Sequence, residues 1–481
     1  MIEQKALDIT AFIDDFLKFE EEKHMFDIEL NGIKIWQYMR VIFYRHIRTE
    51  LMAYEIEQVP AIPEKYRGKK TLRILFDQYF KKNQMFARHR DVLLVSMARK
   101  QEYEKNHYRC IYTDDLETAL KPTKYVLSRN NRAKDYVYEK SKNIINFDVG
   151  LFMDMKNITY ESKVNKYEAY DKLISPIEEW FGIHFDIRVQ KNILRDLNYR
   201  TRHYYIFGDY YRYLLKKIRP KVIVLTAGYD LANQVLIKIA KEKNIPTIEL
   251  EHGMTGKNNM AYNFLKKRKL ECFPDYFFCF GQYDRDTTRW PIETSHVIAV
   301  GFPNLEKQVI EAKKELPQQK NHILFISQMN NEIFTAARDL AARIDTDKYK
   351  IVVKLHPSEY ARYYEDIEPF FKGTGVEVIH TSEKTLYHYF NEAAWIVGEG
   401  SSTALFEATM FDSKIAVLKT ERIEDNILVE TGKALGVDNI EELVEAINHN
   451  TFIPSEEYSF FEEDSINKMC TNIEEIMKKG R

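Results

Sequence analysis

The sequence predicts an α/β protein with two domains, each built on a parallel sheet with crossover helices, preceded by a helical N-terminal extension. Three observations predict this fold class. The chain has 481 residues, enough for two or three domains. From residue 91 onward, short β-branched runs alternate with helical stretches, which is the rhythm of parallel sheets. The alternation pauses at the charged stretch 306–320 and then resumes, which indicates a second sheet.

Residues 1–90 are predicted to form a helical region. Apolar residues recur there at helical spacing and give one face, namely Ile33, Trp36, Met39, Ile42 and Phe43. Positive charge interrupts this face at Arg40, Arg45 and Arg48. Segment 69–90 carries seven Lys and Arg residues against one acid, Asp77, with leucines and aromatic residues between them. A basic amphipathic helix of this kind can lie on an anionic membrane surface, and the alternative is a helix packed on its own domain.

The first α/β domain is predicted over 91–305. Its strands are expected at 91–97, 221–228, 246–253, 275–281 and 296–303. The second is predicted over 306–460, with strands at 321–327, 349–357, 376–380, 393–400 and 413–418. A C-terminal helix is predicted at 461–481. Two such domains are expected to face each other across a cleft, with ligands outside the carboxyl ends of the strands.

Composition excludes several classes of protein. Lys plus Arg number 71 and Asp plus Glu 73, a net charge of −2 that argues against nucleic-acid binding. The four cysteines have neither zinc-ligand spacing nor the density of a disulfide framework. The N-terminus lacks the basic and apolar runs of a signal peptide, and no apolar run is long enough to span a bilayer. We expect a cytoplasmic protein that can touch the inner face of the membrane.

Two strand ends in the second domain carry residues that suit an anionic ligand. His356 and Pro357 end one strand, with Lys354 two residues earlier; the alternative is a structural histidine. The other strand runs into Gly398, Glu399 and Gly400, after which Ser401, Ser402 and Thr403 open a helix. Backbone N–H groups, the helix dipole and hydroxyls converge at such a helix start, and the alternative is a plain N-cap.

A third strand end, in the first domain, carries Glu251 and His252. A carboxylate beside an imidazole at a strand end is suited to act as a general base. Glu249 lies two residues before Glu251 on the same predicted strand, and its side chain could face solvent.

The segments KLHP and GEGSSTALFEA, with the EHG loop, resemble bacterial capsule and lipopolysaccharide glycosyltransferases of the GT-B fold, which include sialyl-, polysialyl- and Kdo transferases that use CMP-activated sugars. More distantly the chain is similar to CDP-glycerol glycerophosphotransferases. The resemblance implies that His356, Ser401 and Ser402 bind the nucleotide phosphate. It also implies that the EHG loop lies on the acceptor side, where a base belongs; Glu251 is slightly favoured over His252.

The resemblance further implies transfer of a sugar from a nucleotide donor, CMP-linked, to a capsular or surface polysaccharide or a lipid-linked acceptor. Glu399 and Glu407 have the E-x7-E spacing of retaining GT-B enzymes that use other nucleotides, so Glu407 is a candidate ribose contact. His356, the helix start and Lys354 would stabilise the leaving phosphate. We expect no metal and no cofactor, because the one D-x-D pair, Asp284 and Asp286, is predicted to begin a helix.

Three alternatives stay open. A nucleotide-sugar 2-epimerase has the same two-domain architecture and needs no acceptor. A glycerophosphotransferase would use CDP-glycerol in place of a nucleotide sugar. A catalytically inactive assembly protein of a polysaccharide complex would release no nucleotide from any donor.

Overall fold

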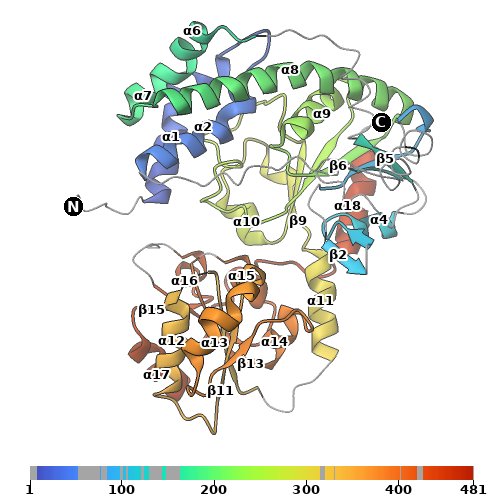
Figure 1. Ribbon diagram of the computed structural model, residues 1–481. Helices are drawn as coiled ribbons and strands as arrows, with labels where there is room; N and C mark the ends of the chain where they lie inside the picture. The colour runs from blue at the N-terminus through green and yellow to red at the C-terminus, as the bar shows by residue number, and fades with distance from the viewer. Residues whose placement is uncertain are drawn as a thin grey trace. The chain divides into compact units, whose positions relative to one another are not determined.

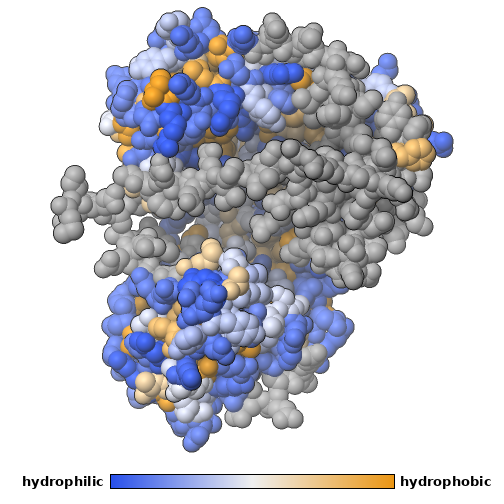
Figure 2. Space-filling view, viewed as in Figure 1, coloured by the Kyte–Doolittle hydropathy of each residue, from blue (hydrophilic) through white to orange (hydrophobic). Residues whose placement is uncertain are grey.

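The computed structural model describes residues 8–52, 76, 84–97, 101–104, 107–120, 124–128, 143–147, 163–314, 320–329, 331–400, 402–419 and 426–479. These residues form two compact units, one within 1–303 together with the chain from 463 onward, and one within 304–462. Figure 1 shows the elements of each unit. On the face seen in Figure 2, the described surface is largely hydrophilic, with hydrophobic residues scattered over it.

The first unit is built on a seven-stranded parallel sheet with strand order β5-β4-β1-β6-β7-β8-β9. The strands are β1 (Val92–Val95), β4 (Lys124–Ser128), β5 (Ile144–Asn146), β6 (Val222–Thr226), β7 (Thr247–Leu250), β8 (Tyr276–Cys279) and β9 (Val297–Ala299). A separate antiparallel pair is formed by β2 (Gln101–Glu104) and β3 (His107–Arg109). Strands β1, β6 and β7 are buried along their whole length. Burial on both faces explains the nearly continuous apolar sequences of β1 (VLLV) and β6 (VIVLT), whereas β7 (TIEL) buries a threonine and a glutamate as well.

Helices cover both faces of this sheet. Leu93, Ile223 and their neighbours share one hydrophobic core with α1 (Ile9–Glu22), α2 (Trp36–Leu51), α8 (Ile187–Ile218) and α9 (Leu231–Glu242). The opposite face, with Val92 and Val224, packs against α4 (Asp114–Ala119) and α18 (Ser465–Lys479). The C-terminal helix α18 therefore belongs to the first unit, as Figure 1 shows. Shorter helices are α6 (Lys166–Ala169), α7 (Ser175–Phe181) and α10 (Gln282–Thr287).

The N-terminal helices α1 and α2 confirm the prediction of a helical N-terminal region. Asp8 caps α1 by accepting a hydrogen bond from the N–H of Ala11. Trp36, Met39 and Phe43 are buried as the apolar face predicts. Of the predicted basic segment 69–90, only Phe76 and residues 84–90 lie in the described part of the chain, so its predicted helix lies mostly outside the described residues.

The second unit is built on a six-stranded parallel sheet with strand order β12-β11-β10-β13-β14-β15. The strands are β10 (His322–Ile326), β11 (Lys350–Lys354), β12 (Glu377–Ile379), β13 (Ala393–Glu399), β14 (Lys414–Leu418) and β15 (Leu435–Val437). Its helices are α11 (Pro303–Lys314), α12 (Asn331–Ala341), α13 (Glu368–Phe371), α14 (Leu386–Glu392), α15 (Thr403–Ala408), α16 (Ile427–Glu430) and α17 (Ile440–His449).

Both sheets follow the doubly wound order in which the chain begins in the middle, builds one side and then returns to build the other. The predicted fold class, two Rossmann-like parallel sheets with a helical N-terminal extension, is confirmed. The reversal falls between β1 and β6 in the first unit and between β10 and β13 in the second. Ligands of such sheets bind beyond the carboxyl ends of the strands at the reversal, so the residues that follow these strands are the candidates for function.

Candidate functional site

In the second unit, the carboxyl ends of β11 and β13 flank that of β10. His356 follows β11, and Glu399 ends β13. Between them, Gln328 donates a hydrogen bond from Nε2 to the backbone carbonyl of Glu399 (3.3 Å). Ser327, directly after β10, is buried, and its hydroxyl has no hydrogen-bond partner among the described residues. Sequence reasoning missed Ser327, although its place at the end of a predicted strand was a usable signal.

His356 is exposed and begins the short 3-10 helix Pro357–Arg362. Its Nδ1 lies 2.7 Å from the hydroxyl of Ser358. The backbone N–H of His356 donates to the carboxylate of Glu359 (2.9 Å), which completes a capping box. The predicted proline stop is therefore correct, and the imidazole stands at the carboxyl edge with its Nδ1 engaged by the chain.

Lys354 is buried, in contrast to His356. Its ammonium donates to the hydroxyl of Tyr360 (2.6 Å) and to the carbonyl of Leu355 (3.2 Å). It also lies 4.8 Å from the centre of the Tyr360 ring. The hydroxyl of Tyr360 in turn donates to the carbonyl of Thr381 (3.0 Å). These contacts connect β11 to the segment after β12. Lys354 therefore has a structural role, independent of any contact that it makes with a ligand.

The predicted helix start after β13 is observed. Ser402 is the N-cap residue of α15 and Thr403 its first residue, and Ser401 lies outside the described residues. The Ser402 side chain makes no capping hydrogen bond, so its hydroxyl is not used by the helix. Glu399 is buried at the end of β13. Glu407 accepts a hydrogen bond from the hydroxyl of Tyr387 (3.0 Å), and burial raises the pKa of its carboxyl group to about 7.

In the first unit, Glu251 lies just beyond β7 and is only 1% exposed. Its carboxylate accepts hydrogen bonds from the backbone N–H groups of Thr255 (2.8 Å) and Phe280 (2.5 Å). Asp284, on α10, is also buried and accepts from the same Thr255 N–H (3.1 Å). Burial, and next the charge of Asp284, raise the pKa of Glu251 well above its usual value. Burial raises the pKa of Asp284 to about 7.

His252 is the more accessible member of the predicted pair. Its Nε2 lies 3.0 Å from the hydroxyl of Tyr229, and its backbone carbonyl accepts from the hydroxyl of Tyr112 (2.9 Å). Its Nδ1 is buried and has no hydrogen-bond partner in the described part of the chain. Burial lowers the pKa of His252 to about 4, so the imidazole is neutral at pH 7. A neutral imidazole keeps a lone pair that can accept a proton.

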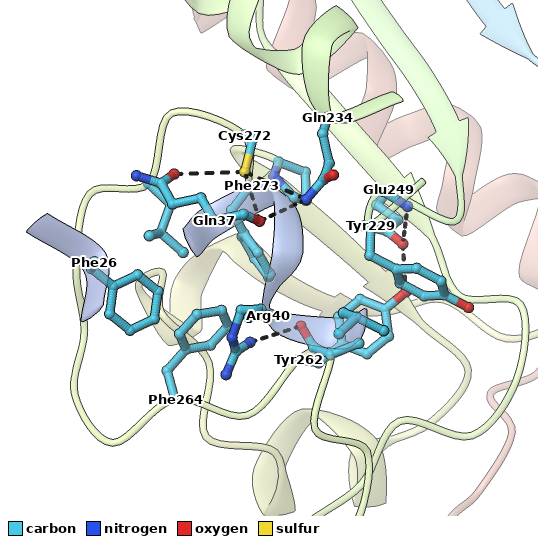
Figure 3. Close-up of a pocket in the computed structure, with 15 residues that line it drawn as sticks. Phe26, Gln37, Arg40, Tyr229, Gln234, Glu249, Tyr262, Phe264, Cys272 and Phe273 are labelled. Carbon is cyan, nitrogen blue, oxygen red and sulfur yellow. Dashed lines mark hydrogen bonds between the residues drawn. The ribbon is translucent and has the colours of Figure 1, made fainter. Parts of the chain in front are cut away.

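The position facing solvent that we considered for Glu249 is wrong, because this residue is 1% exposed. Its carboxylate accepts from the hydroxyl of Tyr262 (2.5 Å) and from the N–H of Gly228 (2.7 Å). Figure 3 shows Glu249 beside Tyr229 and Tyr262 at one end of a pocket. Both faces of a central parallel strand are covered, so alternation along β7 does not distinguish core from solvent.

That pocket extends from Glu249 to Arg40 of α2. Arg40 interrupts the apolar face in sequence but is buried, and its guanidinium pairs with both carboxylate oxygens of Glu20 (2.8 Å each). It also donates to the carbonyls of Met260 (3.1 Å) and Asn263 (3.0 Å) and lies over the ring of Phe264. The cavity volume is about 30 Å³, room for one or two waters and not for a nucleotide. Arg40 therefore secures the loop that follows the EHG segment.

The two acids of the D-x-D pair lie in different environments. Asp284 is buried against Glu251, whereas Asp286 pairs with its neighbour Arg285 (2.8 Å), and both lie in α10 as the sequence predicts. No group of three or more His, Cys, Asp or Glu side chains among the described residues is arranged to hold a metal ion. No described helix is both long and apolar enough to cross a membrane.

No protein-family model and no curated protein matches the chain. Solved structures do. A putative UDP-N-acetylglucosamine 2-epimerase from Listeria monocytogenes is 12% identical, with a TM-score of 0.45, over 81% of this chain and 97% of that one. A variant of the wall teichoic acid polymerase TagF is 10% identical, with a TM-score of 0.44, over 93% and 99%. A UGT transferase from Siraitia grosvenorii in complex with UDP is 12% identical, with a TM-score of 0.43, over 80% and 100%. At these identities and scores we infer no activity from them.

Proposed function

We propose that this protein is a glycosyltransferase that moves a sugar from a nucleotide-activated donor, CMP-linked, to a capsular or surface polysaccharide or a lipid-linked acceptor. One observation carries the proposal. His356, Glu399, Gly400, Ser402 and Thr403 stand at the carboxyl ends of the two strands that flank β10, next to the chain reversal. Residues in this position bind nucleotides in doubly wound sheets, and the KLHP and GEGSS segments resemble the phosphate-binding motifs of such transferases.

The proposed chemistry at the donor is electrostatic. Negative charge builds on the bridging oxygen as the nucleotide phosphate leaves the sugar. The exposed imidazole of His356 and the hydroxyls of Ser401, Ser402 and Thr403 would bind and stabilise that phosphate. Because Lys354 is bound to Tyr360, we propose that it orients the β11 end rather than meeting the phosphate directly. We propose that no metal or cofactor takes part, since the residues at these strand ends supply the donors themselves.

For the general base we favour His252 over Glu251, the reverse of the preference from the sequence. The Glu251 carboxylate is buried and already accepts two backbone hydrogen bonds, so an acceptor hydroxyl cannot reach it without rearrangement. His252 is partly exposed and neutral at pH 7. Although its Nδ1 is also buried, that nitrogen has no hydrogen-bond partner among the described residues, whereas both oxygens of Glu251 are engaged. Glu251 then holds the loop that presents His252.

A panel of CMP-, CDP- and UDP-activated donors tests the proposal. A transferase releases nucleotide in proportion to acceptor consumed, also in the presence of EDTA. A 2-epimerase isomerises its donor without any acceptor, and a CDP-glycerol glycerophosphotransferase releases CMP from CDP-glycerol. An assembly protein does none of these. The Ser401→Ala, Ser402→Ala double variant is expected to bind the active nucleotide about tenfold or more weakly by calorimetry, with an unchanged melting temperature. Unchanged affinity would remove the helix start from the site.

The acceptor determines where the protein would work. A lipid-linked acceptor lies at the inner face of the cell membrane, so we propose a cytoplasmic enzyme that associates peripherally with that surface. Segment 69–90, with its seven basic residues, remains the sequence-based candidate for the attachment.

A further inference from the structure

We propose that the C-terminal end of α8 and residues 85–88 together form a surface that binds anionic lipid bilayers. This basic–apolar patch comprises Met85, Phe86, Arg88, Lys216, Lys217 and Arg219. Residues 85–88 belong to the basic segment recognised in the sequence, whereas the end of α8 was not singled out there. Vesicle binding needs no sugar donor, so this proposal holds or fails independently of the proposed transferase activity.

Backbone contacts join the two parts of the patch. The backbone N–H of Arg90 donates to the carbonyl of Ile218 in the last turn of α8 (3.1 Å), and the His89 ring contacts the same carbonyl (3.0 Å). Phe86 lies three residues before His89, a distance that an extended chain spans in about 10 Å. The apolar pair therefore lies near the basic end of α8, the long green helix in Figure 1.

The exposed apolar side chains are the first reason for a lipid partner. Met85 is 62% exposed and Phe86 55%, and Tyr213, one turn before Lys217, is 39% exposed. Adjacent large apolar side chains at this exposure lie at the surface without burial in the unit's own core, and such patches mark contact surfaces. Insertion into the acyl boundary of a bilayer would remove them from water.

The local excess of positive charge is the second reason. Lys216, Lys217 and Arg219 are all exposed. Two acids of the same unit are paired with bases outside the patch, Asp91 with Lys221 (3.0 Å) and Asp209 with Arg212 (3.3 Å). Basic heads on long apolar stems beside inserted apolar residues complement an anionic lipid surface.

A nucleic acid is the competing partner for a basic surface. Both partners are polyanions, so charge alone does not distinguish a nucleic acid from an anionic bilayer. The adjacent side chains of Met85 and Phe86 can insert into the apolar part of a bilayer. The phosphates of a nucleic acid would contact only the basic side chains. The combination favours lipid.

Co-sedimentation of the full chain with vesicles tests the proposal, using phosphatidylcholine alone and phosphatidylcholine mixed with phosphatidylglycerol. We expect binding to the anionic vesicles only, weakening as salt rises. Each basic residue near such a surface contributes about fivefold in affinity, so Lys216→Gln, Lys217→Gln, Arg219→Gln should bind about 100-fold more weakly. Met85→Gln, Phe86→Gln should lose about tenfold or more.

The matched control removes three exposed lysines from the second unit, with Lys348→Gln, Lys372→Gln and Lys384→Gln, and should bind as the parent does. Circular dichroism and thermal melting establish that each variant is folded. The proposal is overturned by equal binding to neutral vesicles, by no binding to either, or by a triple α8 variant that binds like the parent. Binding to single-stranded RNA in place of vesicles, lost in the same triple variant, would assign the patch to nucleic acid.

Discussion

The carboxylates of Glu251 and Asp284 accept hydrogen bonds from one and the same backbone N–H group, that of Thr255, at 2.8 and 3.1 Å. Both side chains are fully buried. Two carboxylates this close in a low-dielectric interior cannot both be ionised at little cost, so the pair retains a proton near neutral pH. This pair joins the end of β7 to α10 and fixes the loop that carries His252.

Asp284→Asn should stabilise the protein at alkaline pH. The pKa of Asp284 is raised in the folded state, so the unfolded chain binds fewer protons and stability falls as pH rises from about 4 to 7. The side-chain amide in the variant Asp284→Asn cannot ionise, so the folding stability should no longer fall as the pH rises. We expect a gain on the order of 2 kcal/mol at pH 8 and little difference at pH 4, measured by denaturant unfolding. Asp286→Asn, on the exposed side of α10, is the matched control; an equal gain there would contradict the explanation.

Gly228→Ala should destabilise the first unit. A Cβ atom at this position would lie 2.1 Å from the Glu249 carboxylate, which is itself held by Tyr262 and cannot move away freely. Overpacking of this kind costs about 1–3 kcal/mol. Thermal melting measures it, with Gly253→Ala as control, because nothing lies within 4 Å of a Cβ there. Equal melting temperatures for the two variants would show that the residues around Gly228 can move to accommodate the added Cβ atom.

Arg40→Met should be among the most damaging changes in the N-terminal helices. It leaves the buried Glu20 carboxylate without its bidentate partner, a loss of about 3–5 kcal/mol. Adding Glu20→Gln to Arg40→Met should recover part of that stability, because the unpaired charge is gone. Denaturant unfolding of both single variants and the double variant gives the coupling energy. Purely additive effects would mean that the pair contributes no interaction of its own.

His252→Gln should reduce turnover by about 100-fold or more if His252 is the base. Burial holds the pKa of His252 at about 4, so the parent should lose activity only as pH falls through that value, when the imidazole becomes protonated. The variant should lack this acid limb. A full pH–rate profile distinguishes the base from a merely structural histidine, whose replacement would leave the limb in place.

His356→Ala should lower kcat by about 100-fold with a smaller effect on donor affinity, because the charge that the imidazole meets grows as the leaving group departs. The side chain is exposed, so the fold should survive. Ser358→Ala is the control, since it removes the hydroxyl 2.7 Å from Nδ1 and leaves the ring. Steady-state kinetics measure kcat for both variants. Equal losses of kcat would mean that the capping of the helix Pro357–Arg362 matters for turnover and that the imidazole itself does not.

The sequence by itself determined the class of fold and the ends of the main strands. The apolar-rich runs that precede Glu251, His356 and Glu399 are buried, and a proline or glycine follows shortly after each of them. The strands β4, β5 and β15 were not predicted, whereas β9 and β12, which are as short as β5 and β15, were. The return of the C-terminal helix α18 to the first unit also depends on contacts remote in sequence.

Only the tertiary structure decided the environment of the polar residues. The alternation of residues along a strand predicts which face of the sheet a side chain points to. In a sheet whose two faces are both covered by helices, it does not predict whether that face is exposed to solvent. Glu249, Glu251 and Asp284 are buried because the segment after β7, α10 and the loop at Gly228 close over them. Arg40 looks like a surface charge in sequence and is buried because Glu20 and backbone carbonyls from residues 260–263 surround it. Burial is set by what packs against a residue, and that partner lies up to 223 positions away.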